Sequence, residues 1–260
     1  MTRVVPKRRL GQHFLVDRNV LGVIERLARL TPHDVVLEVG PGLGVLTAFL
    51  ADRVRHVHAI ELDRSLEPRL REMLAGRADV ELVFADALAV DLAALEPPPG
   101  KLVANLPYNV ATPVVAETLT GVPALSSWCV MVQREVAERF FAEPGTKAYG
   151  AVSVLVRLHA RRTGFHPVSR TVFRPPPRVD SALLAFERIE PPPKADAVLR
   201  VVGGAFGHRR KTLANSLALS GVASREQAVE ALATIGRRGD VRAEALEPGE
   251  FVLLAGALGP

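Results

Sequence analysis

The sequence of 260 residues contains a single cysteine, Cys129, and only 5% aromatic residues. One cysteine excludes an internal disulfide framework and a zinc site built from several thiolates. No apolar run approaches the roughly 20 residues of a membrane-spanning helix, and the first 15 residues lack the apolar stretch of a signal peptide. The seven histidines do not show the sequence spacing of a metal site. We therefore expect a cytoplasmic protein with no membrane segment and no metal.

The formal net charge is only +5 at pH 7, but it is unevenly distributed. Residues 1–30 carry seven basic and two acidic residues, whereas residues 31–154 carry ten basic and sixteen acidic ones. Six arginines and no acid lie between Leu155 and Val179. Basic flanks around an acidic middle indicate a polyanion that contacts the flanks. Arginine-rich surfaces that merely keep a protein in solution give the same pattern, so charge alone leaves both interpretations open.

Proline clusters at residues 97–99, 175–177 and 191–193 divide the sequence. Consecutive prolines cannot continue a helix or a central strand. The last cluster predicts a linker, so we expect one domain over residues 1–190 and a smaller one over residues 191–260.

In the first part, short apolar runs typical of buried strands alternate with helical patterns. The predicted strands are Val35–Val39, Val57–Ile60, Val80–Phe84, Leu102–Ala104, Cys129–Val132 and Ser181–Phe186. The predicted helices between them are Val45–Ala51, Ser65–Leu74 and Thr112–Leu119. This alternation predicts an α/β fold with a parallel sheet and crossover helices. The second part is predicted to be all helical, with helices at Ala197–Phe206, Thr212–Leu219, Ser224–Ile235 and Gly249–Leu258.

The first predicted strand ends in a glycine-rich loop, and ligands of open α/β sheets bind beyond the carboxyl ends of the strands. Gly40, Gly42 and Gly44 allow a tight turn and a close approach of backbone to ligand. The dinucleotide fingerprint requires its third glycine where this sequence has Val45. Pro41 also removes a backbone donor to a pyrophosphate. The loop therefore disfavours an NAD-dependent oxidoreductase and favours another adenosine-bearing cofactor.

Carboxylates end the next two predicted strands. Glu61 follows Gly40 by 21 residues, where a carboxylate accepts hydrogen bonds from ribose hydroxyls. Asp86 is placed to accept a hydrogen bond from an adenine amino group, but aspartate is equally common there as a helix cap.

The fourth predicted strand ends in Asn105-Leu-Pro-Tyr108. The side-chain carbonyl of Asn105 and the backbone carbonyl of Leu106 could accept the two N–H bonds of an exocyclic amine on a base. That orientation favours a pyramidal, more nucleophilic nitrogen. Pro107 fixes the turn, and Tyr108 offers a flat face on which an unpaired base can stack. Asn and Pro also form ordinary turns, but four such features at successive strand ends make a site the better interpretation.

These residues resemble the ribosomal RNA adenine N6,N6-dimethyltransferase family. The matching segments extend over nearly the whole chain: Gly11-Gln-His-Phe-Leu15, Leu37–Thr47, Glu61, Asp86-Ala87, Asn105–Tyr108, Gln133–Arg139, Tyr149-Gly150, Phe173–Ser181 and Ala205–Leu213.

The resemblance implies a Rossmann-like methyltransferase domain, a small helical domain and S-adenosylmethionine as cofactor. It implies dimethylation of two adjacent adenosines near the 3′ end of small-subunit rRNA during ribosome assembly, by an enzyme that we expect to be a monomer. The implied cofactor contacts are His13, Leu15, Gly40, Gly42, Glu61, Asp86 and Asn105. The implied target-base contacts are Asn105, Leu106, Tyr108 and, as a second stacking face, Phe173. The family usually has asparagine at the position of His13.

Basic residues near these motifs are expected to bind RNA phosphates, which provide affinity rather than sequence choice. The candidates are Arg8, Arg9, Arg209, Arg210 and Lys211.

Two alternatives remain at this stage. The first is the related family that methylates adenine in large-subunit rRNA and confers macrolide resistance. The second is an RNA- or DNA-binding assembly or transcription factor that has lost catalysis.

Overall fold

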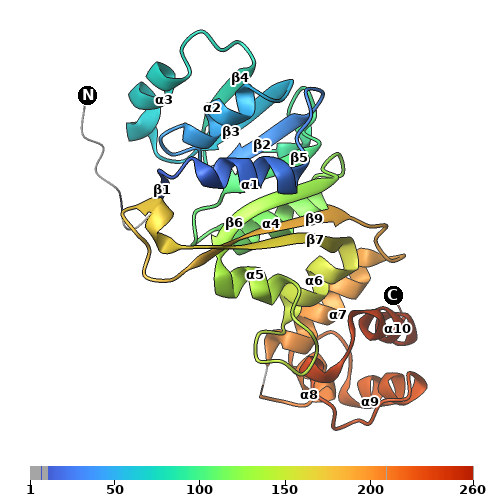
Figure 1. Ribbon diagram of the computed structural model, residues 1–260. Helices are drawn as coiled ribbons and strands as arrows, with labels where there is room; N and C mark the ends of the chain where they lie inside the picture. The colour runs from blue at the N-terminus through green and yellow to red at the C-terminus, as the bar shows by residue number, and fades with distance from the viewer. Residues whose placement is uncertain (1–6, 8–10, 209, 260) are drawn as a thin grey trace. The chain divides into compact units, whose positions relative to one another are not determined.

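In a computed structural model, which describes residues 7, 11–208 and 210–259, the chain forms two compact units (Figure 1). Unit 1 contains the residues up to Ala137 together with Arg161–Arg188. Unit 2 contains Glu138–Ala160 and the residues from Ile189 onward. One junction between the units falls at the predicted linker, and unit 2 also includes a segment that precedes it. A division into a catalytic and an RNA-docking domain stays a prediction.

Unit 1 is built on a seven-stranded sheet with the strand order β4-β3-β2-β5-β6-β9-β7. The strands are β2 (Val35–Val39), β3 (His56–Glu61), β4 (Val80–Phe84), β5 (Lys101–Asn105), β6 (Ser127–Gln133), β7 (Ala160–Val168) and β9 (Ser181–Arg188). All six predicted strands are present.

The expectation of a parallel sheet holds only for β2 to β6. Strand β9 runs antiparallel to β6, so the sheet is mixed. An apolar run predicts burial but not direction, because buried parallel and antiparallel strands share that composition. Strand β7 has no apolar run because it forms the sheet edge and is largely exposed.

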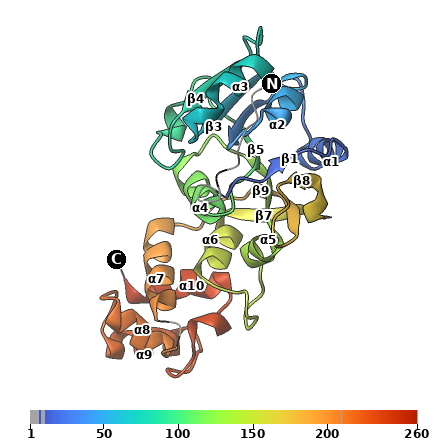
Figure 2. The ribbon, with the colours of Figure 1, turned by 90° about the vertical axis from the view of Figure 1, so that its left-hand side faces the viewer.

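Helices cover both faces of this sheet, as Figure 2 shows for α1 (Asn19–Ala28) and α4 (Ala111–Gly121). Helix α1 packs against β5, β6 and β9, and α2 (Val45–Ala51) packs against β3. Their apolar side chains join one core cluster with the sheet. Two further helices, α3 (Glu67–Met73) and α5 (Arg134–Phe140), complete the chain before unit 2 begins within α5. The sequence reasoning did not identify α1, although Val20, Leu21, Ile24 and Ala28 are buried at helical spacing.

The loops after β2, β3, β4 and β5 meet at one edge of the sheet, because parallel strands bring their carboxyl ends together. A two-stranded antiparallel sheet of β1 (Phe14–Leu15) and β8 (Phe173–Arg174) lies next to them. This small sheet brings the N-terminal segment close to the strand ends. Gly11, just before β1, is so close to the loop after β5 that a Cβ atom at this position would lie 3.3 Å from Asn109 Oδ1.

Unit 2 is helical, as predicted for its C-terminal part. Its helices are α6 (Ala151–His159), α7 (Ala195–Gly207), α8 (Leu213–Leu219), α9 (Arg225–Thr234) and α10 (Pro248–Leu258). They share one apolar core. The side chains of Ser224 and Gln227 form a capping box at the start of α9. None of the helices in the described ranges is long and apolar enough to span a membrane.

Candidate functional site

A pocket opens at the carboxyl ends of β2 to β5 and lies entirely within unit 1. Its empty volume is about 1010 Å³, including the open mouth. The residues that line it come from the N-terminal segment and from four strand ends: Gly11–Leu15, Glu38–Leu43, Ile60–Leu62, Ala85–Leu88 and Asn105–Val110, with Val45, Leu46 and Val114. The structure thus brings together nine of the ten residues that the sequence assigns to the cofactor and the target base, all except Phe173.

The glycines of the first loop are required by both conformation and space. Gly40 has φ +77°, and a Cβ placed there would lie 3.0 Å from the ring of Pro107. Gly42 has φ +59°, and its Cβ would lie 3.0 Å from Phe14. The loop therefore packs directly against the Asn105–Tyr108 turn and against β1, with no room for side chains between them.

We expect Gly40→Ala to weaken cofactor binding and lower the melting temperature. The left-handed conformation costs a residue with a Cβ about 1–2 kcal/mol, and the clash additionally displaces Pro107 and the turn around it. Gly76→Ala is the matched control, because Gly76 has φ +79° but nothing within 4 Å of its Cβ position. Calorimetric titration with the cofactor that the resemblance implies, S-adenosylmethionine, and thermal unfolding check this. Equal affinity losses in both variants would contradict the contact with Pro107.

Glu61, at the end of β3, is held by backbone donors. Its Oε2 accepts from the amide of Gly42 at 3.1 Å, and its Oε1 accepts from the amide of Asp63 at 2.8 Å. Burial raises the pKa of this carboxyl, and the two hydrogen bonds offset part of that rise. Each oxygen has capacity for a second hydrogen bond, so the side chain is a preoriented acceptor for a pair of hydroxyls.

Glu38, at the end of β2, is a further acidic group of the pocket that sequence reasoning left without a role. Its side chain is 1% exposed, and Oε2 has no hydrogen-bond partner among the described residues. Burial raises its pKa to about 8; the charge of Glu61 adds to the rise, and the nearby Thr47 hydroxyl lowers it somewhat. A cationic ligand in the pocket would stabilise the ionised form of this carboxyl and lower its pKa.

Asp86 lies at the end of β4 beside two exposed apolar side chains. Its Oδ1 accepts from the amide of Leu88 at 3.0 Å, so the carboxylate shapes its own turn. Leu62 is 53% exposed and Leu88 is 42% exposed, and both line the pocket. Two exposed leucines next to a carboxylate provide apolar contact and a hydrogen-bond acceptor for a flat polar ring. Sequence reasoning offers no signal for these leucines, because leucine usually indicates core.

Asn105, the last residue of β5, donates from Nδ2 to the carbonyl of His13 at 3.1 Å. This bond orients the amide so that Oδ1 is the atom left to accept from a ligand. The side chain of Leu106 is buried, and its backbone amide donates to Met131 at 3.1 Å. The turn that follows β5 is therefore tied to the neighbouring strand and to the N-terminal segment.

The ring of Tyr108 lies beside that of His13, with centroids 5.3 Å apart and planes inclined by 34°. The Tyr108 hydroxyl is 2.5 Å from Ser181 Oγ, and burial raises its pKa. His13 Nδ1 is 2.8 Å from the carbonyl oxygen of Pro175, which can only accept, so Nδ1 carries the hydrogen. These contacts fix both rings at the pocket.

Phe173 does not line the pocket. It is 1% exposed, pairs with Leu15 across the β1–β8 sheet and belongs to the core cluster of unit 1. The ring would have to leave the core to stack on a base, so its predicted role receives no support from this placement.

Asp63 is a further residue that the sequence reasoning missed, two positions after Glu61. It accepts hydrogen bonds from Lys7 Nζ at 2.6 Å, Gln12 Nε2 at 2.9 Å and Ser65 Oγ at 2.6 Å. Burial acts to raise its pKa, but these bonds outweigh burial and hold the pKa well below its usual range. This ionised group anchors the N-terminal segment over the pocket.

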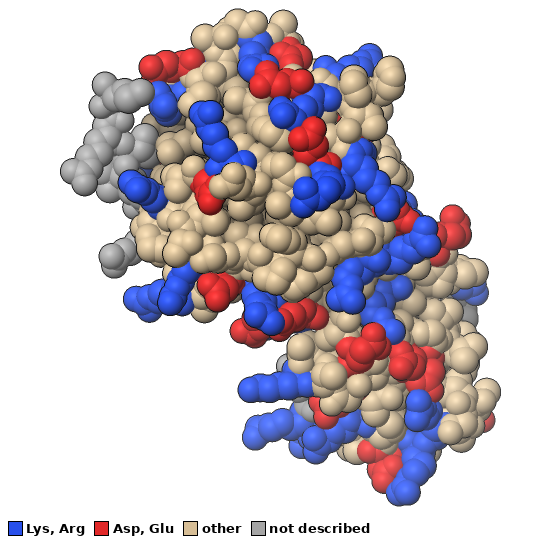
Figure 3. Space-filling model, in the orientation of Figure 1, with Lys and Arg blue, Asp and Glu red and all other residues tan. Residues whose placement is uncertain are grey.

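The predicted RNA-binding residues are only partly described. Arg8, Arg9 and Arg209 lie outside the described residues. Arg210 and Lys211 are exposed between α7 and α8, where an RNA phosphate could reach them. On the face in Figure 3, Lys and Arg are interspersed with Asp and Glu rather than gathered in a single patch.

Comparison with known proteins places these features in context. The sequence model of a family described as "Ribosomal RNA adenine dimethylase" matches residues 5–254. The chain is 49% identical over 256 residues to "Ribosomal RNA small subunit methyltransferase A" of Rubrobacter xylanophilus, covering 98% of this chain and 96% of the relative. It is 43% identical over 261 residues to the protein of that name from Geobacter metallireducens, with coverages of 97% and 95%.

Two solved structures share the architecture. A dimethyladenosine transferase from Plasmodium falciparum superposes with a TM-score of 0.78 at 23% identity, over 93% of this chain and 96% of that chain. The 23S rRNA methyltransferase ErmE superposes with a TM-score of 0.66 at 31% identity, over 94% and 99%. The Rossmann-like fold predicted from the sequence is confirmed.

Proposed function

The chain belongs to the ribosomal RNA adenine dimethylase family, and from this premise we propose that it dimethylates N6 of two adjacent adenosines near the 3′ end of small-subunit rRNA. The observation that carries the proposal is the pocket in which Asn105 Oδ1 is left as an acceptor beside the acidic groups Glu38 and Glu61. We propose S-adenosylmethionine as the methyl donor.

The pocket fits that cofactor in three respects. The buried Glu38 Oε2, which has no hydrogen-bond partner among the described residues, could pair with a cation. Glu61 offers two preoriented acceptors for ribose hydroxyls. Asp86, Leu62 and Leu88 suit a purine ring. When bound, S-adenosylmethionine supplies an electrophilic methyl group on a sulfonium.

The residues of the chain would then act by positioning and by electrostatics. Asn105 Oδ1 and the Leu106 carbonyl would accept the two N–H bonds of the target amine and direct its nitrogen towards the methyl group. Tyr108 would stack on the extruded adenine. Direct displacement requires no covalent enzyme intermediate, and the methylated amine would lose its proton after the transfer.

Mass spectrometry of rRNA incubated with the chain and deuterated methyl donor tests this function. The substrates are bare small-subunit rRNA, an assembling small subunit and large-subunit rRNA. We expect two methyl groups on each of two adjacent adenosines in small-subunit rRNA. Label in large-subunit rRNA alone would overturn the assignment, as would cofactor binding without label in any substrate.

One comparison favours a second candidate, adenine methylation of large-subunit rRNA. ErmE, a 23S rRNA methyltransferase, is 31% identical to this chain and shares its fold. The relatives named for small-subunit rRNA are 43% and 49% identical over nearly the whole chain, so they support the first candidate. Expression in a macrolide-sensitive bacterium separates the two, because only large-subunit methylation confers resistance.

The remaining parts of the proposal concern the setting of the reaction. Unit 2, with exposed Arg210 and Lys211, would dock rRNA or the assembling subunit through phosphate contacts. The enzyme would act as a monomer in the cytoplasm.

A further inference from the structure

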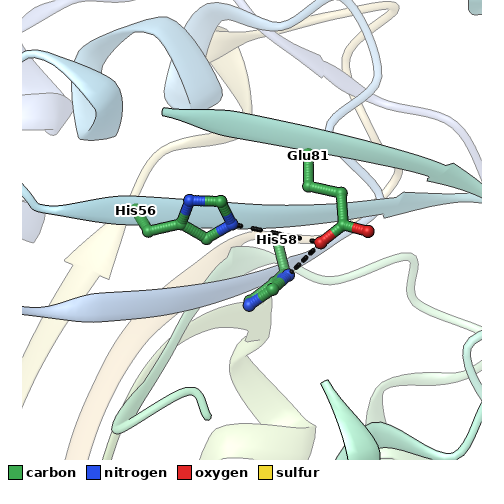
Figure 4. A group of neighbouring side chains, drawn as sticks. All are labelled: His56, His58 and Glu81. Atoms are coloured by element: carbon green, nitrogen blue, oxygen red, sulfur yellow. Dashed lines mark hydrogen bonds and ion pairs between the residues drawn. The ribbon is translucent and has the colours of Figure 1, made fainter. Parts of the chain in front are cut away.

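The side chains of His56, His58 and Glu81 point toward one another (Figure 4), in the amino-terminal halves of β3 and β4. His56 and His58 are two positions apart on β3, so they extend from the same face of the strand. Glu81 lies on the edge strand β4 and pairs in register with His58. Glu61, which faces the pocket, ends the same strand that His56 begins. The group is therefore separate from the cofactor pocket.

The two imidazole rings present nitrogens to one carboxylate oxygen. Glu81 Oε2 is 2.8 Å from His58 Nδ1 and 4.0 Å from His56 Nε2. The ring centroids are 4.5 Å apart with planes inclined by 66°. His56 Nε2 is buried and has no hydrogen-bond partner among the described residues. The ligand atoms of all three side chains lie within 4.8 Å of one another.

The hydrogen on His58 is placed by its other contact. His58 Nε2 lies 2.8 Å from the carbonyl oxygen of Pro97, which can only accept, so Nε2 carries the hydrogen. On a neutral ring Nδ1 is then a bare lone pair. It faces a carboxylate oxygen, which is also an acceptor. Either a proton on Nδ1 or a metal ion beside it must therefore lie between the two facing acceptors.

We propose that His56, His58 and Glu81 bind a divalent transition-metal ion of the zinc class. Imidazole and carboxylate form a zinc-type ligand set, with water as the fourth ligand. In tetrahedral geometry, metal–ligand bonds of about 2.0–2.1 Å place ligand atoms roughly 3.4 Å apart. The observed separations of 2.8 Å and 4.0 Å each differ from that value by about 0.6 Å, so small side-chain rotations would bring the three ligand atoms to metal spacing. The Pro97 carbonyl supplies the second-sphere acceptor that orients a metal-bound histidine.

A metal ion bound at this site would link the edge strand β4 to its neighbour β3. Among the described strands, β4 lies at the sheet edge beside β3 and is mostly half-exposed. It leads directly to Asp86 in the pocket, so a metal bridge between the two strands would fix the register of the strand that positions Asp86. Besides Glu81, the charges that act on His56 are those of His58, Asp79 and Arg55.

The proposal departs from the expectation that the chain binds no metal, which rests on histidine spacing alone. Glu81 follows His58 by 23 residues, and only the parallel pairing of β3 with β4 brings the two together. Sequence spacing alone therefore does not indicate that Glu81 lies beside the two histidines.

The test is calorimetric titration of the untagged, chelator-treated full chain with Zn²⁺ alone. We expect one Zn²⁺ per chain and a rise in melting temperature on binding. Glu81→Gln and His56→Gln should each lower the affinity at least about tenfold, since even second-sphere losses cost 10–100-fold. Both positions are outside the deep core, and circular dichroism establishes that the variants fold.

His166→Gln and Glu230→Gln serve as matched controls, because both side chains are exposed and lie away from the group, His166 on the opposite edge strand β7 and Glu230 on α9. They should bind Zn²⁺ as the unaltered chain does. If His58 and Glu81 instead form an imidazolium–carboxylate pair, Zn²⁺ will not bind at 1:1 stoichiometry. That result would overturn the proposal, as would equal affinities in the unaltered chain, Glu81→Gln and His56→Gln.

Discussion

Replacing Asn105 with alanine should lower kcat for methyl transfer by about a hundredfold to a thousandfold. Loss of one preorganised polar group that acts on the reacting atoms typically costs this much. The Asn105 amide is fixed by its bond to the His13 carbonyl, so in the proposed reaction Oδ1 would accept from the target amine. Alanine leaves the amine with only the Leu106 carbonyl to accept its hydrogens. Binding of RNA by phosphate contacts should be largely retained.

Single-turnover rates and RNA affinities, measured separately, check this prediction. Asn19→Ala is the control, because Asn19 is an exposed asparagine at the start of α1, away from the pocket-lining residues. Calorimetry with S-adenosylmethionine shows whether the lost bond to His13 also weakens the cofactor site. Retained methylation by Asn105→Ala would contradict the assigned role of the side chain.

The fold was predictable where burial determines the sequence pattern. The strands β2, β5, β6 and β9 contain buried apolar runs because both sheet faces are covered there. The antiparallel direction of β9 could not be predicted, because strand direction leaves no mark on the hydrophobic pattern. The edge strand β7 could not be predicted either, because its exposed residues form no apolar run. Unit 2 also takes residues 138–160, a segment that no proline cluster separates from unit 1.

The site was predictable where chemistry needs an unusual residue at a strand end. Gly40, Glu61 and Asn105 are such residues, and all line the pocket. Asp63 and Glu38 have roles that depend on contacts from distant segments, so sequence position gives no indication of them. For Phe173 the motif implies a stacking role, but the side chain is buried in the core. Membership of a motif therefore does not by itself predict that a residue lines the pocket.

Replacing Glu38 with glutamine should stabilise the free protein by about 3 kcal/mol at pH 7. The pKa of this carboxyl is raised by burial from 4.5 to about 8. Keeping the proton in the native state costs about 1.4 kcal/mol for each pH unit above the ordinary pKa. The ordinary pKa of 4.5 lies roughly 2.5 pH units below pH 7. Glutamine resembles the protonated form and has no charge to lose or gain, so it avoids this penalty.

The sign of the pH dependence follows from proton binding in the two states. Below pH 4.5 both states are protonated and Glu38 makes no difference. Between pH 4.5 and about 8 the native state keeps a proton that the unfolded state has lost, so the free energy of unfolding falls as pH rises. Urea unfolding at several pH values should show this slope in the unaltered chain and a shallower one in Glu38→Gln. Glu61 adds to the slope, because burial raises its pKa as well.

The same carboxyl couples cofactor binding to pH. A cationic ligand favours the ionised form of Glu38, so the affinity for S-adenosylmethionine should increase as pH rises towards about 8. That increase should be smaller in Glu38→Gln and unchanged in Glu230→Gln, whose side chain is exposed in unit 2. Equal pH profiles in all three proteins would mean that the buried carboxyl does not contribute to cation binding. A neutral Glu38 in the free protein would then affect stability alone.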